Sequence, residues 1–565
     1  MVKVLFVASE AVPFIKTGGL ADVMGALPKE LAAQGMDVRL VIPKYSAIGD
    51  TFKDQMKPVA TGTVNLAWRQ LYYGVEELDW NGVKVYFIDN EQYFKRDGLY
   101  GYGDDAERFA YFCRAVLTML PKIGFQPDII HCNDWHTGLM GVFLKEDFYH
   151  DSFYSHMKVI YTIHNLKYQG IYGPEIMSDI IGLDQRLFTN GNLECNGCVN
   201  FMKAGMVYAD FITTVSNTYA DEITYPYFGE HLDGYIRDNR SRLVGIINGL
   251  DEDVYNPATD PLIDVNYTAD DFQIKKHLNK KALQEELGLP VSRNTPMIAM
   301  ISRLVEAKGL DLVMCIMDEV LLNDAQFVVI GTGDYEYEEG LRQLAQRYPN
   351  KVNVQIRFNE ALAHKLYAAS DLFIMPSRYE PCGLSQLIAL KYGSVPIVRE
   401  TGGLKDTVIP FDKHTNTGNG LSFPNFNAHE LLFSIQRGLS FYADSSLWEP
   451  LVRNAMTSDY SWHQSANAYT DLYRRVLGLP ADAPVNEPEP APKIVEPTPA
   501  PETAPAPEAT PTTEAAPAVE ATPAAEPAPA TKPASTTKKP AAKKTTKRST
   551  TKTSKTSRAK KAPTA

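Results

Sequence analysis

The stretch from Lys16 to Asp22, with the sequence Lys-Thr-Gly-Gly-Leu-Ala-Asp, combines residue types that suit the binding of an anion. Paired glycines let the backbone approach a ligand closely and turn its N–H groups outward. The stretch follows the β-like run 2–8 and precedes an apolar pattern with helical spacing, so the positive end of a helix dipole lies beside it. Because Lys16 adds a full positive charge, the pattern predicts a phosphate-binding loop. For an isolated pair of glycines, a plain tight turn is the simpler alternative.

A second copy of this motif, Thr-Gly-Gly-Leu-Lys-Asp at residues 401–406, follows the apolar run 395–398. Glu400 now stands where the first copy has Lys16. One Gly-Gly loop in each half of the chain indicates two α/β domains that face a shared cleft. We therefore expect both loops to bind phosphate groups of a ligand, through Lys16, Gly18 and Gly19 in the first copy and Thr401, Gly402 and Gly403 in the second.

Two cations and a carboxylate follow predicted strands of the second half. Arg303 comes just after the strand predicted at 296–302, and Lys308 stands at the start of the next helix. Arginine offers phosphate a bidentate fork and lysine a compact charge, which suits a diphosphate leaving group. Glu380 follows the strand predicted at 371–375, and a carboxylate among cations can hold sugar hydroxyls. Ordinary surface cations and a local ion pair are the alternatives.

These motifs together resemble the bacterial glycogen synthase and plant starch synthase family, which are retaining glucosyltransferases with two Rossmann-type domains. The resemblance covers residues 1 to about 478, with the motifs in the family's order. Besides the first Gly-Gly loop it rests on Asn133-Asp134-Trp135-His136, Thr162-Ile163-His164-Asn165-Leu166, Ile247-Asn248-Gly249, Ser302-Arg303-Leu304 with Lys308-Gly309, and Pro376 to Leu384.

The resemblance implies a glycogen synthase activity that transfers glucose from ADP-glucose to the non-reducing end of an α-1,4-glucan with retention of configuration. It implies no metal and no cofactor. The catalytic residues that it implies are His164, Arg303, Lys308, Glu380 and Asp134. To the donor-binding residues of the two loops it adds Asn248, Cys382, Gly383 and Leu384. Glu10, Asp22 and Asn165 are expected to organise the first loop or contact substrate.

One departure from related transferases points to the glycogen and starch synthase branch. Relatives outside this branch carry a second glutamate eight positions after the residue matched by Glu380, and here that position is Ile388. Another nucleotide-sugar glycosyltransferase, using UDP-glucose or a small acceptor, is the alternative within enzymes. A glucan-binding scaffold without catalysis is the alternative from a different class. No residue identified in the sequence distinguishes adenine from uracil.

The remaining chemistry-bearing residues give weaker signals. Asp251-Glu252-Asp253 is the nearest approach to an acidic metal site, but it falls in the predicted linker. The six cysteines are scattered without a disulfide framework, which fits a reducing compartment. Cys195 and Cys198 form a Cys-x-x-Cys pair that is interpreted as structural, with a metal or redox role as alternatives.

The spacing of apolar runs predicts an α/β fold with two Rossmann-like, doubly wound domains that face a cleft. The family resemblance implies that this is the GT-B architecture. In the first domain we expect strands at 2–8, 37–42, 83–89, 128–133, 158–163, 210–215 and 242–247, and helices near 20–34, 105–120 and 136–147. In the second we expect strands at 296–302, 326–330, 352–357, 371–375 and 395–398. The segment 62–80 interrupts the first series and is interpreted as a β-hairpin insertion.

Four regions follow from these patterns. We expect residues 1–250 to form the N-terminal domain and residues 251–460 the second domain. The family resemblance implies that the first lies on the acceptor side and that the second binds the nucleotide sugar. The family resemblance implies that 461–480, with a helix at 463–477, packs back on the first domain. Residues 481–565 are rich in Pro, Ala, Thr, Glu and Lys without aromatics, and we expect them to be disordered.

The tail also has a charge pattern. Residues 532–561 hold 12 Lys and Arg and no acidic residue. Such a segment can bind a polyanion such as nucleic acid through counterion release, and a solubilising tail is the equally weighted alternative. The sequence contains no apolar stretch of membrane-spanning length, and the first predicted strand leaves no room for a signal peptide. We therefore expect a cytoplasmic enzyme.

Overall fold

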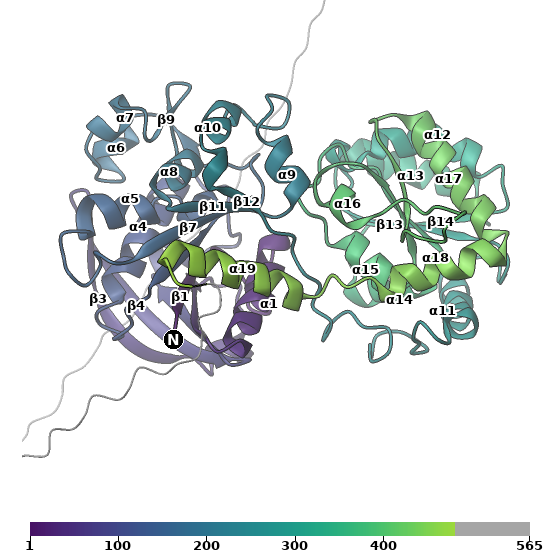
Figure 1. The fold of residues 1–565 in the computed structure, drawn as a ribbon, viewed down its shortest axis with the longest axis horizontal. Coiled ribbons are helices and arrows are strands. Elements are labelled where there is room, and N and C mark those ends of the chain that lie inside the picture. Colours follow the sequence, from purple (N-terminus) through teal and green to yellow (C-terminus); the bar gives the residue numbers. More distant parts are fainter. Residues whose placement is uncertain (481–565) are drawn as a thin grey trace, which may run out of the picture. The chain divides into compact units, whose positions relative to one another are not determined.

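Two β-sheets with parallel central strands organise the chain (Figure 1). The structure is a computed structural model that describes residues 1–480, and these belong to one compact unit. The first sheet has nine strands in the order β12-β11-β7-β6-β1-β2-β5-β4-β3. Its strands are β1 (Lys3–Val7), β2 (Asp37–Pro43), β3 (Lys57–Leu66), β4 (Arg69–Trp80), β5 (Val83–Asp89), β6 (Ile129–Asn133), β7 (Lys158–Ile163), β11 (Phe211–Thr214) and β12 (Leu243–Gly245).

The second sheet has six strands, all paired in parallel, in the order β15-β14-β13-β16-β17-β18. Its strands are β13 (Met297–Ile301), β14 (Gln326–Ile330), β15 (Val352–Gln355), β16 (Leu372–Met375), β17 (Val395–Arg399) and β18 (Leu421–Phe423). Every residue of β13, β14 and β16 is buried. Such continuous apolar runs are typical of parallel strands that helices cover on both faces of the sheet.

The helices follow the strands in alternation, as a doubly wound fold requires. Those of the first half are α1 (Gly19–Ala33), α2 (Asp50–Lys53), α3 (Glu91–Phe94), α4 (Asp105–Met119), α5 (Met140–Phe143), α6 (Ile176–Asp179), α7 (Arg186–Thr189), α8 (Phe201–Tyr208), α9 (Asn217–Glu222) and α10 (Asp233–Asp238). Those of the second half are α11 (Phe272–Leu287), α12 (Leu310–Val320), α13 (Tyr335–Arg347), α14 (Glu360–Ala369), α15 (Ser385–Lys391), α16 (Gly402–Thr407), α17 (Ala428–Tyr442), α18 (Ser445–Thr457) and α19 (Trp462–Leu477).

The fold class predicted from the apolar runs is confirmed, and so are the predicted strands. The segment 62–80 is part of a β-hairpin, β3 and β4, which extends the first sheet with two antiparallel strands. The helix predicted at 136–147 is wrong as one element. It consists of a 3-10 turn (Trp135–Thr137), α5 and a π-helical turn (Leu144–Phe148). Here a Cβ atom on Gly138 would lie 2.0 Å from the Phe201 carbonyl, so α8 packs directly on this backbone.

The order of the strands fixes where ligands can bind. In the first sheet β1 lies between β2 and β6, and in the second β13 lies between β14 and β16. At each point the chain crosses to opposite sides of the sheet, which opens a crevice beyond the carboxyl ends of the two central strands. The loops after β1 and β6, and after β13 and β16, carry most of the predicted site residues.

The last helix, α19, lies beside α1 of the first half (Figure 1). Tyr473 donates to or accepts from His131 Nδ1 at 2.8 Å, and Thr470 donates to Gln34 Oε1 at 2.6 Å. Trp462 and Tyr469 are buried in the core around the first sheet. Among the described helices, none is long and apolar enough to cross a membrane.

Candidate functional site

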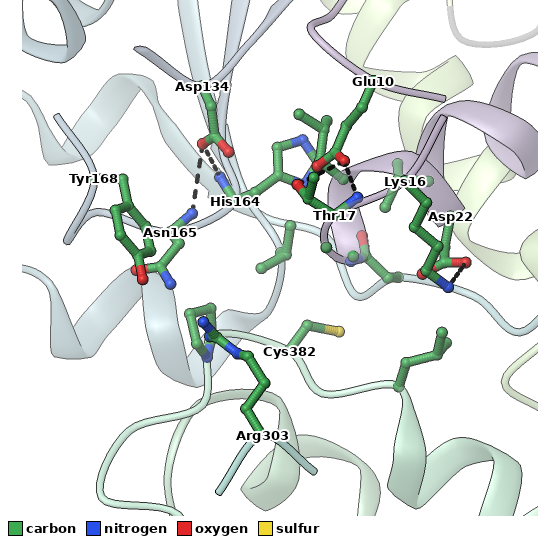
Figure 2. A pocket seen from close by; sticks show the side chains of 18 of the residues that line it. Glu10, Lys16, Thr17, Asp22, Asp134, His164, Asn165, Tyr168, Arg303 and Cys382 are labelled. Carbon is green, nitrogen blue, oxygen red and sulfur yellow. Dashed lines mark hydrogen bonds and ion pairs between the residues drawn. The ribbon is translucent and has the colours of Figure 1, made fainter. Parts of the chain in front are cut away.

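A cavity of about 1040 Å³ lies between the loops that follow the central strands of both sheets. The first half contributes the loops after β1, β6 and β7, and the second half contributes those after β13 and β16. Figure 2 shows side chains of both halves pointing into this space, with Asp134 and His164 on one side and Arg303 and Cys382 on the other. The cavity therefore lies where ligands bind in doubly wound sheets, and its size suits a small-molecule ligand.

The first Gly-Gly loop is held by its own carboxylates and stays open to the cavity. Thr17 donates its backbone N–H and its hydroxyl to Glu10 Oε2, the latter at 2.8 Å. Burial raises the pKa of Glu10 despite these hydrogen bonds. Lys16 pairs with Asp22 at 2.7 Å (Figure 2). Because a Cβ atom on Gly19 would meet nothing within 4 Å, the loop leaves room for a ligand.

Asp134 is a half-buried carboxylate at the switch point of the first sheet. Its backbone has φ 56°, a value that few non-glycine residues adopt. Its Oδ1 accepts the backbone N–H of His164 at 2.8 Å and that of Asn165 at 3.4 Å. Burial raises the pKa of Asp134 to about 7 against these hydrogen bonds. Asp134 therefore positions the loop after β7 and changes charge near neutral pH.

His164 is neutral and its tautomer follows from its neighbours. Asn133 Nδ2 donates to the Val7 and His131 carbonyls, so its Oδ1 is left to accept the His164 Nε2–H at 2.9 Å. Burial lowers the pKa of His164 to about 3. With Nε2 as donor, His164 Nδ1 carries a lone pair and can accept a hydrogen bond from a sugar hydroxyl.

The second half adds two cations, Arg303 and Lys308, to the cavity. Lys308 Nζ pairs with Glu380 Oε2 at 2.5 Å, and Ser377 donates its hydroxyl to the same oxygen at 2.9 Å. Arg303 is exposed and makes no side-chain hydrogen bond or ion pair with any residue in 1–480. Its guanidinium is therefore available to a phosphate.

The other predicted donor-site residues of the second half also line the cavity. Cys382, Gly383 and Leu384 do so next to Glu380, and burial raises the thiol pKa of Cys382 to about 12, so the thiol is protonated. Asn248 lines it as well, and its Oδ1 is buried without a hydrogen-bond partner in the described chain. Ile388 is a buried part of the same wall, so no second carboxylate stands there.

The second Gly-Gly loop packs behind the cavity wall. Thr401, Gly402 and Gly403 do not line the cavity, so the prediction that they bind the donor directly receives no support from their position. A Cβ atom on Gly402 would lie 1.9 Å from the Glu380 carbonyl oxygen, and one on Gly403 would lie 2.1 Å from the Cys382 carbonyl oxygen. These glycines serve close packing behind the Glu380 segment.

Two family models match the chain. Residues 3–238 match the starch synthase catalytic domain, and residues 284–441 match glycosyl transferases group 1. The glycogen synthases of Desulforamulus reducens and Geobacillus stearothermophilus are 52% and 54% identical over 475 residues, which are 84% of this chain and 99% and 98% of those proteins. The chain belongs to the glycogen synthase family. It is a glycosyltransferase.

Solved structures agree with this membership in the glycogen synthase family. The catalytic domain of starch synthase IV from Arabidopsis thaliana, bound to ADP and acarbose, matches with a TM-score of 0.79 and 32% identity, covering 84% of this chain and 99% of that one. The sucrose-phosphate synthase of Thermosynechococcus elongatus matches with a TM-score of 0.54 and 19% identity, covering 85% of this chain and all of that one, and supports the fold alone.

This glycogen synthase family member also has cavity residues that sequence reasoning missed. They are mostly aromatic or apolar: Tyr100, Tyr102, Trp135, Tyr168, Ile171, Tyr172, Phe358 and Trp462. Trp135 and His136 stand inside a motif that was identified, but their spacing gave no signal for a role. Ile171 and Tyr172 form the short strand β8 (Ile171–Tyr172), Trp462 begins α19, and the rest lie in loops. None of them belongs to a recognised motif, so only the tertiary structure brings them to the site.

The weaker candidates lie apart from the cavity. Cys195 and Cys198 face each other across the hairpin of β9 (Glu194–Cys195) and β10 (Cys198–Asn200), and both are free. Asp253 pairs with Lys29, and Glu252 pairs with Lys391 at 2.8 Å. Among residues 1–480, no group of three or more His, Cys, Asp or Glu side chains has an arrangement that could hold a metal ion.

Proposed function

We propose that this member of the family transfers glucose from ADP-glucose to the non-reducing end of an α-1,4-glucan with retention of configuration. The observation that carries the proposal is the pairing of Lys308 with Glu380 on the same cavity wall as Arg303, opposite Lys16 and His164. The relatives' name supports the glucan product, and the ADP bound to the plant starch synthase IV domain supports the donor.

The cations act on the leaving group. Negative charge builds on the diphosphate as the sugar becomes oxocarbenium-like, and preorganised cations stabilise that charge more than they stabilise the substrate. Arg303 and Lys308 bind the diphosphate from one side, and Lys16 with the N–H groups of Gly18 and Gly19 approaches from the other. Because these groups supply the positive charge, the proposed reaction requires no divalent metal.

The polar groups of the first half orient the sugar. His164 accepts a hydroxyl hydrogen bond through Nδ1, and the unpartnered Oδ1 of Asn248 accepts another. Glu380, already paired with Lys308, holds further hydroxyls of the donor glucose. The incoming 4-hydroxyl attacks from the side on which the nucleotide leaves, and the departing phosphate accepts its proton.

The acceptor glucan occupies the aromatic end of the cavity. Tyr100, Trp135 and Tyr172 line this end together with the Asp105 carboxylate. Sugar rings present apolar C–H faces to aromatic rings and hydroxyls to carboxylates. An acceptor chain can therefore stack here with its terminal 4-hydroxyl directed at the donor.

The direct test is glucose incorporation into glycogen by the full-length protein, with ADP-glucose or UDP-glucose as donor and EDTA present. We expect incorporation from ADP-glucose that EDTA does not reduce. Incorporation from UDP-glucose alone would contradict the donor assignment. It would leave the proposed roles of Arg303, Lys308 and Lys16 at the diphosphate unchanged. No incorporation from either donor, with glycogen still bound, would favour a glucan-binding scaffold.

The tail residues lie outside the described part of the chain, and their polyanion binding is a second proposal that rests on the 12 cations of 532–561. We expect retention on immobilised DNA at low salt that falls steeply as salt rises. A chain ending at residue 480 should lose this retention and keep its specific activity. Equal retention of both chains would contradict the proposal.

We also propose a cytoplasmic location, which the free cysteines of 1–480 support.

A further inference from the structure

Helices α9 and α16 pack against each other where the two halves meet (Figure 1). α9 follows β11 of the first sheet, and α16 follows β17 of the second. Each helix ends near the start of the other, so the two run antiparallel. Each also carries a carboxylate near its C-terminal end, Glu222 on α9 and Asp406 on α16.

Glu222 binds the start of α16. It accepts the Thr401 hydroxyl at 2.9 Å, and its two oxygens lie 3.2 and 3.1 Å from the Gly402 backbone nitrogen. Burial raises the pKa of Glu222, against the lowering effect of these hydrogen bonds. The start of α16, for which the sequence pattern predicts a phosphate, is therefore already bound to a carboxylate from the other half.

Asp406 makes the reciprocal contact at the start of α9. Its Oδ2 accepts the Thr218 backbone N–H at 3.0 Å, and its Oδ1 accepts the Thr218 hydroxyl at 2.5 Å. Both contacts use a threonine hydroxyl together with a backbone N–H. Hydrogen bonds to a charged acceptor are stronger than neutral ones, so the contacts of Glu222 and Asp406 connect α9 and α16 specifically.

The contact region between α9 and α16 also touches the backbone segment that carries Glu380. Gly403 donates its N–H to the Glu380 and Pro381 carbonyls at 3.2 and 3.1 Å. From the first half, Ser216 donates its hydroxyl to the Pro381 carbonyl at 2.6 Å. The backbone that carries Glu380 is therefore held from both halves at once.

We propose that Glu222 and Asp406 are positioning residues, which latch the two halves together and fix the segment Glu380–Cys382 against the first half. Neither lines the cavity, so neither touches substrate. Both act through the second Thr-Gly-Gly motif, whose backbone lies between the latch and the Glu380 segment. The second motif is thus a joint between the two halves.

A thiol-labelling experiment tests the latch without any assay of turnover. Cys382 is 6% exposed and lies in the segment that the latch holds. In full-length Glu222→Ala and Asp406→Ala, we expect a maleimide to label Cys382 at least about tenfold faster than in the wild type, measured on the Cys382 peptide by mass spectrometry. Asp221→Ala is the matched control, because Asp221 precedes Glu222 but pairs with Arg240 of its own half at 2.7 Å. Unchanged labelling in both variants would overturn the latch.

A kinetic experiment tests the positioning role and rests on the proposed glucosyl transfer. We expect kcat to fall about tenfold in each variant while the Kd for ADP stays within about twofold, since the cations that bind the diphosphate are untouched. The double variant should lose less than the product of the single losses, because both carboxylates fix one geometry. Wild-type kcat in the folded variants, or a parallel loss of ADP affinity, would overturn this role. Failure of the wild type to transfer glucose would count against the proposed function. The labelling result alone would then test whether Glu222 and Asp406 hold the two halves together.

Isosteric variants decide the matter if the alanine variants do not fold. Thr218→Val with Thr401→Val removes only the two hydroxyl donors and keeps the volume of both side chains. We expect faster Cys382 labelling than in the wild type by about threefold. Labelling at the wild-type rate in this double variant would overturn the latch.

Discussion

The two Thr-Gly-Gly-Leu-x-Asp motifs share a local design but meet different surroundings. In each copy one glutamate accepts the threonine hydroxyl together with a backbone N–H from the start of the loop. Glu10 does this for Thr17, and Glu222 does it for Thr401 and Gly402. In both, burial raises the pKa of that glutamate.

The surroundings of the glycines separate the two copies. A Cβ atom on Gly19 would meet nothing within 4 Å, whereas one on Gly402 would lie 1.9 Å from a carbonyl oxygen. The first loop faces the cavity, and the second packs behind the Glu380 segment. The same six-residue pattern therefore leaves space for a ligand in one place and allows backbone to touch backbone in the other. Glycine permits both, since it lacks the Cβ atom that would prevent either.

The largest expected effect comes from the cation that faces the first copy across the cavity. Lys308→Ala should reduce turnover by about 10²–10³-fold while the protein stays folded, because the developing charge on the diphosphate loses a fixed cation. Steady-state kinetics with circular dichroism as the folding check measure this. Lys405→Ala, an exposed lysine inside the second copy, is the control and should retain wild-type turnover. Equal losses in both variants would contradict the separation of roles.

Alanine at the corresponding glycines should separate the copies by stability. Gly402→Ala should lower the free energy of unfolding by about 1–3 kcal/mol, because the added methyl group overlaps the Glu380 carbonyl and the residue has φ +44°. Gly19→Ala should change it by less than about 0.5 kcal/mol. Urea unfolding of both variants measures the difference. A destabilised Gly19→Ala with a stable Gly402→Ala would reverse the comparison.

The residue that precedes each copy should matter only in the first. Lys16→Ala should reduce kcat/KM about tenfold, since Lys16 lies at the cavity and contributes charge for the diphosphate. Glu400→Gln should leave kcat/KM within about twofold, because Glu400 accepts the Ser422 hydroxyl at 2.8 Å away from the cavity. Initial rates at varied ADP-glucose measure both. A phosphate role for the second copy would instead appear as a comparable effect at Glu400.

The smallest effect is a pH dependence near the first copy. Burial raises the pKa of Asp134 to about 7, so the carboxyl is neutral below this pH and ionised above it. The ionised form accepts the His164 and Asn165 N–H groups better, and kcat/KM should therefore rise severalfold through about pH 7 and then level. Asp134→Asn should remove this inflection. An identical pH profile in Asp134→Asn would assign the inflection to another group.

Much of the fold and part of the site could be predicted from the amino-acid sequence. The buried strands could be predicted because parallel strands covered on both faces need continuous apolar runs. Arg303, Lys308 and Glu380 could be placed together because they follow strands whose carboxyl ends share one edge of a sheet. The break in the helix predicted at 136–147 could not be predicted from the sequence, since it results from the approach of α8, which is distant in sequence.

The sequence by itself determined the two doubly wound domains, the family and the charged groups of the site, because strand periodicity and motif order are properties of the chain alone. Only the tertiary structure decided which Gly-Gly loop faces the cavity, which aromatic residues line it, and that Glu222 binds the start of α16. These outcomes depend on residues far apart in the chain, such as Glu222 and Gly402, which are separated by 180 positions. A local pattern specifies what a loop is able to bind, and packing decides what is brought within reach of it.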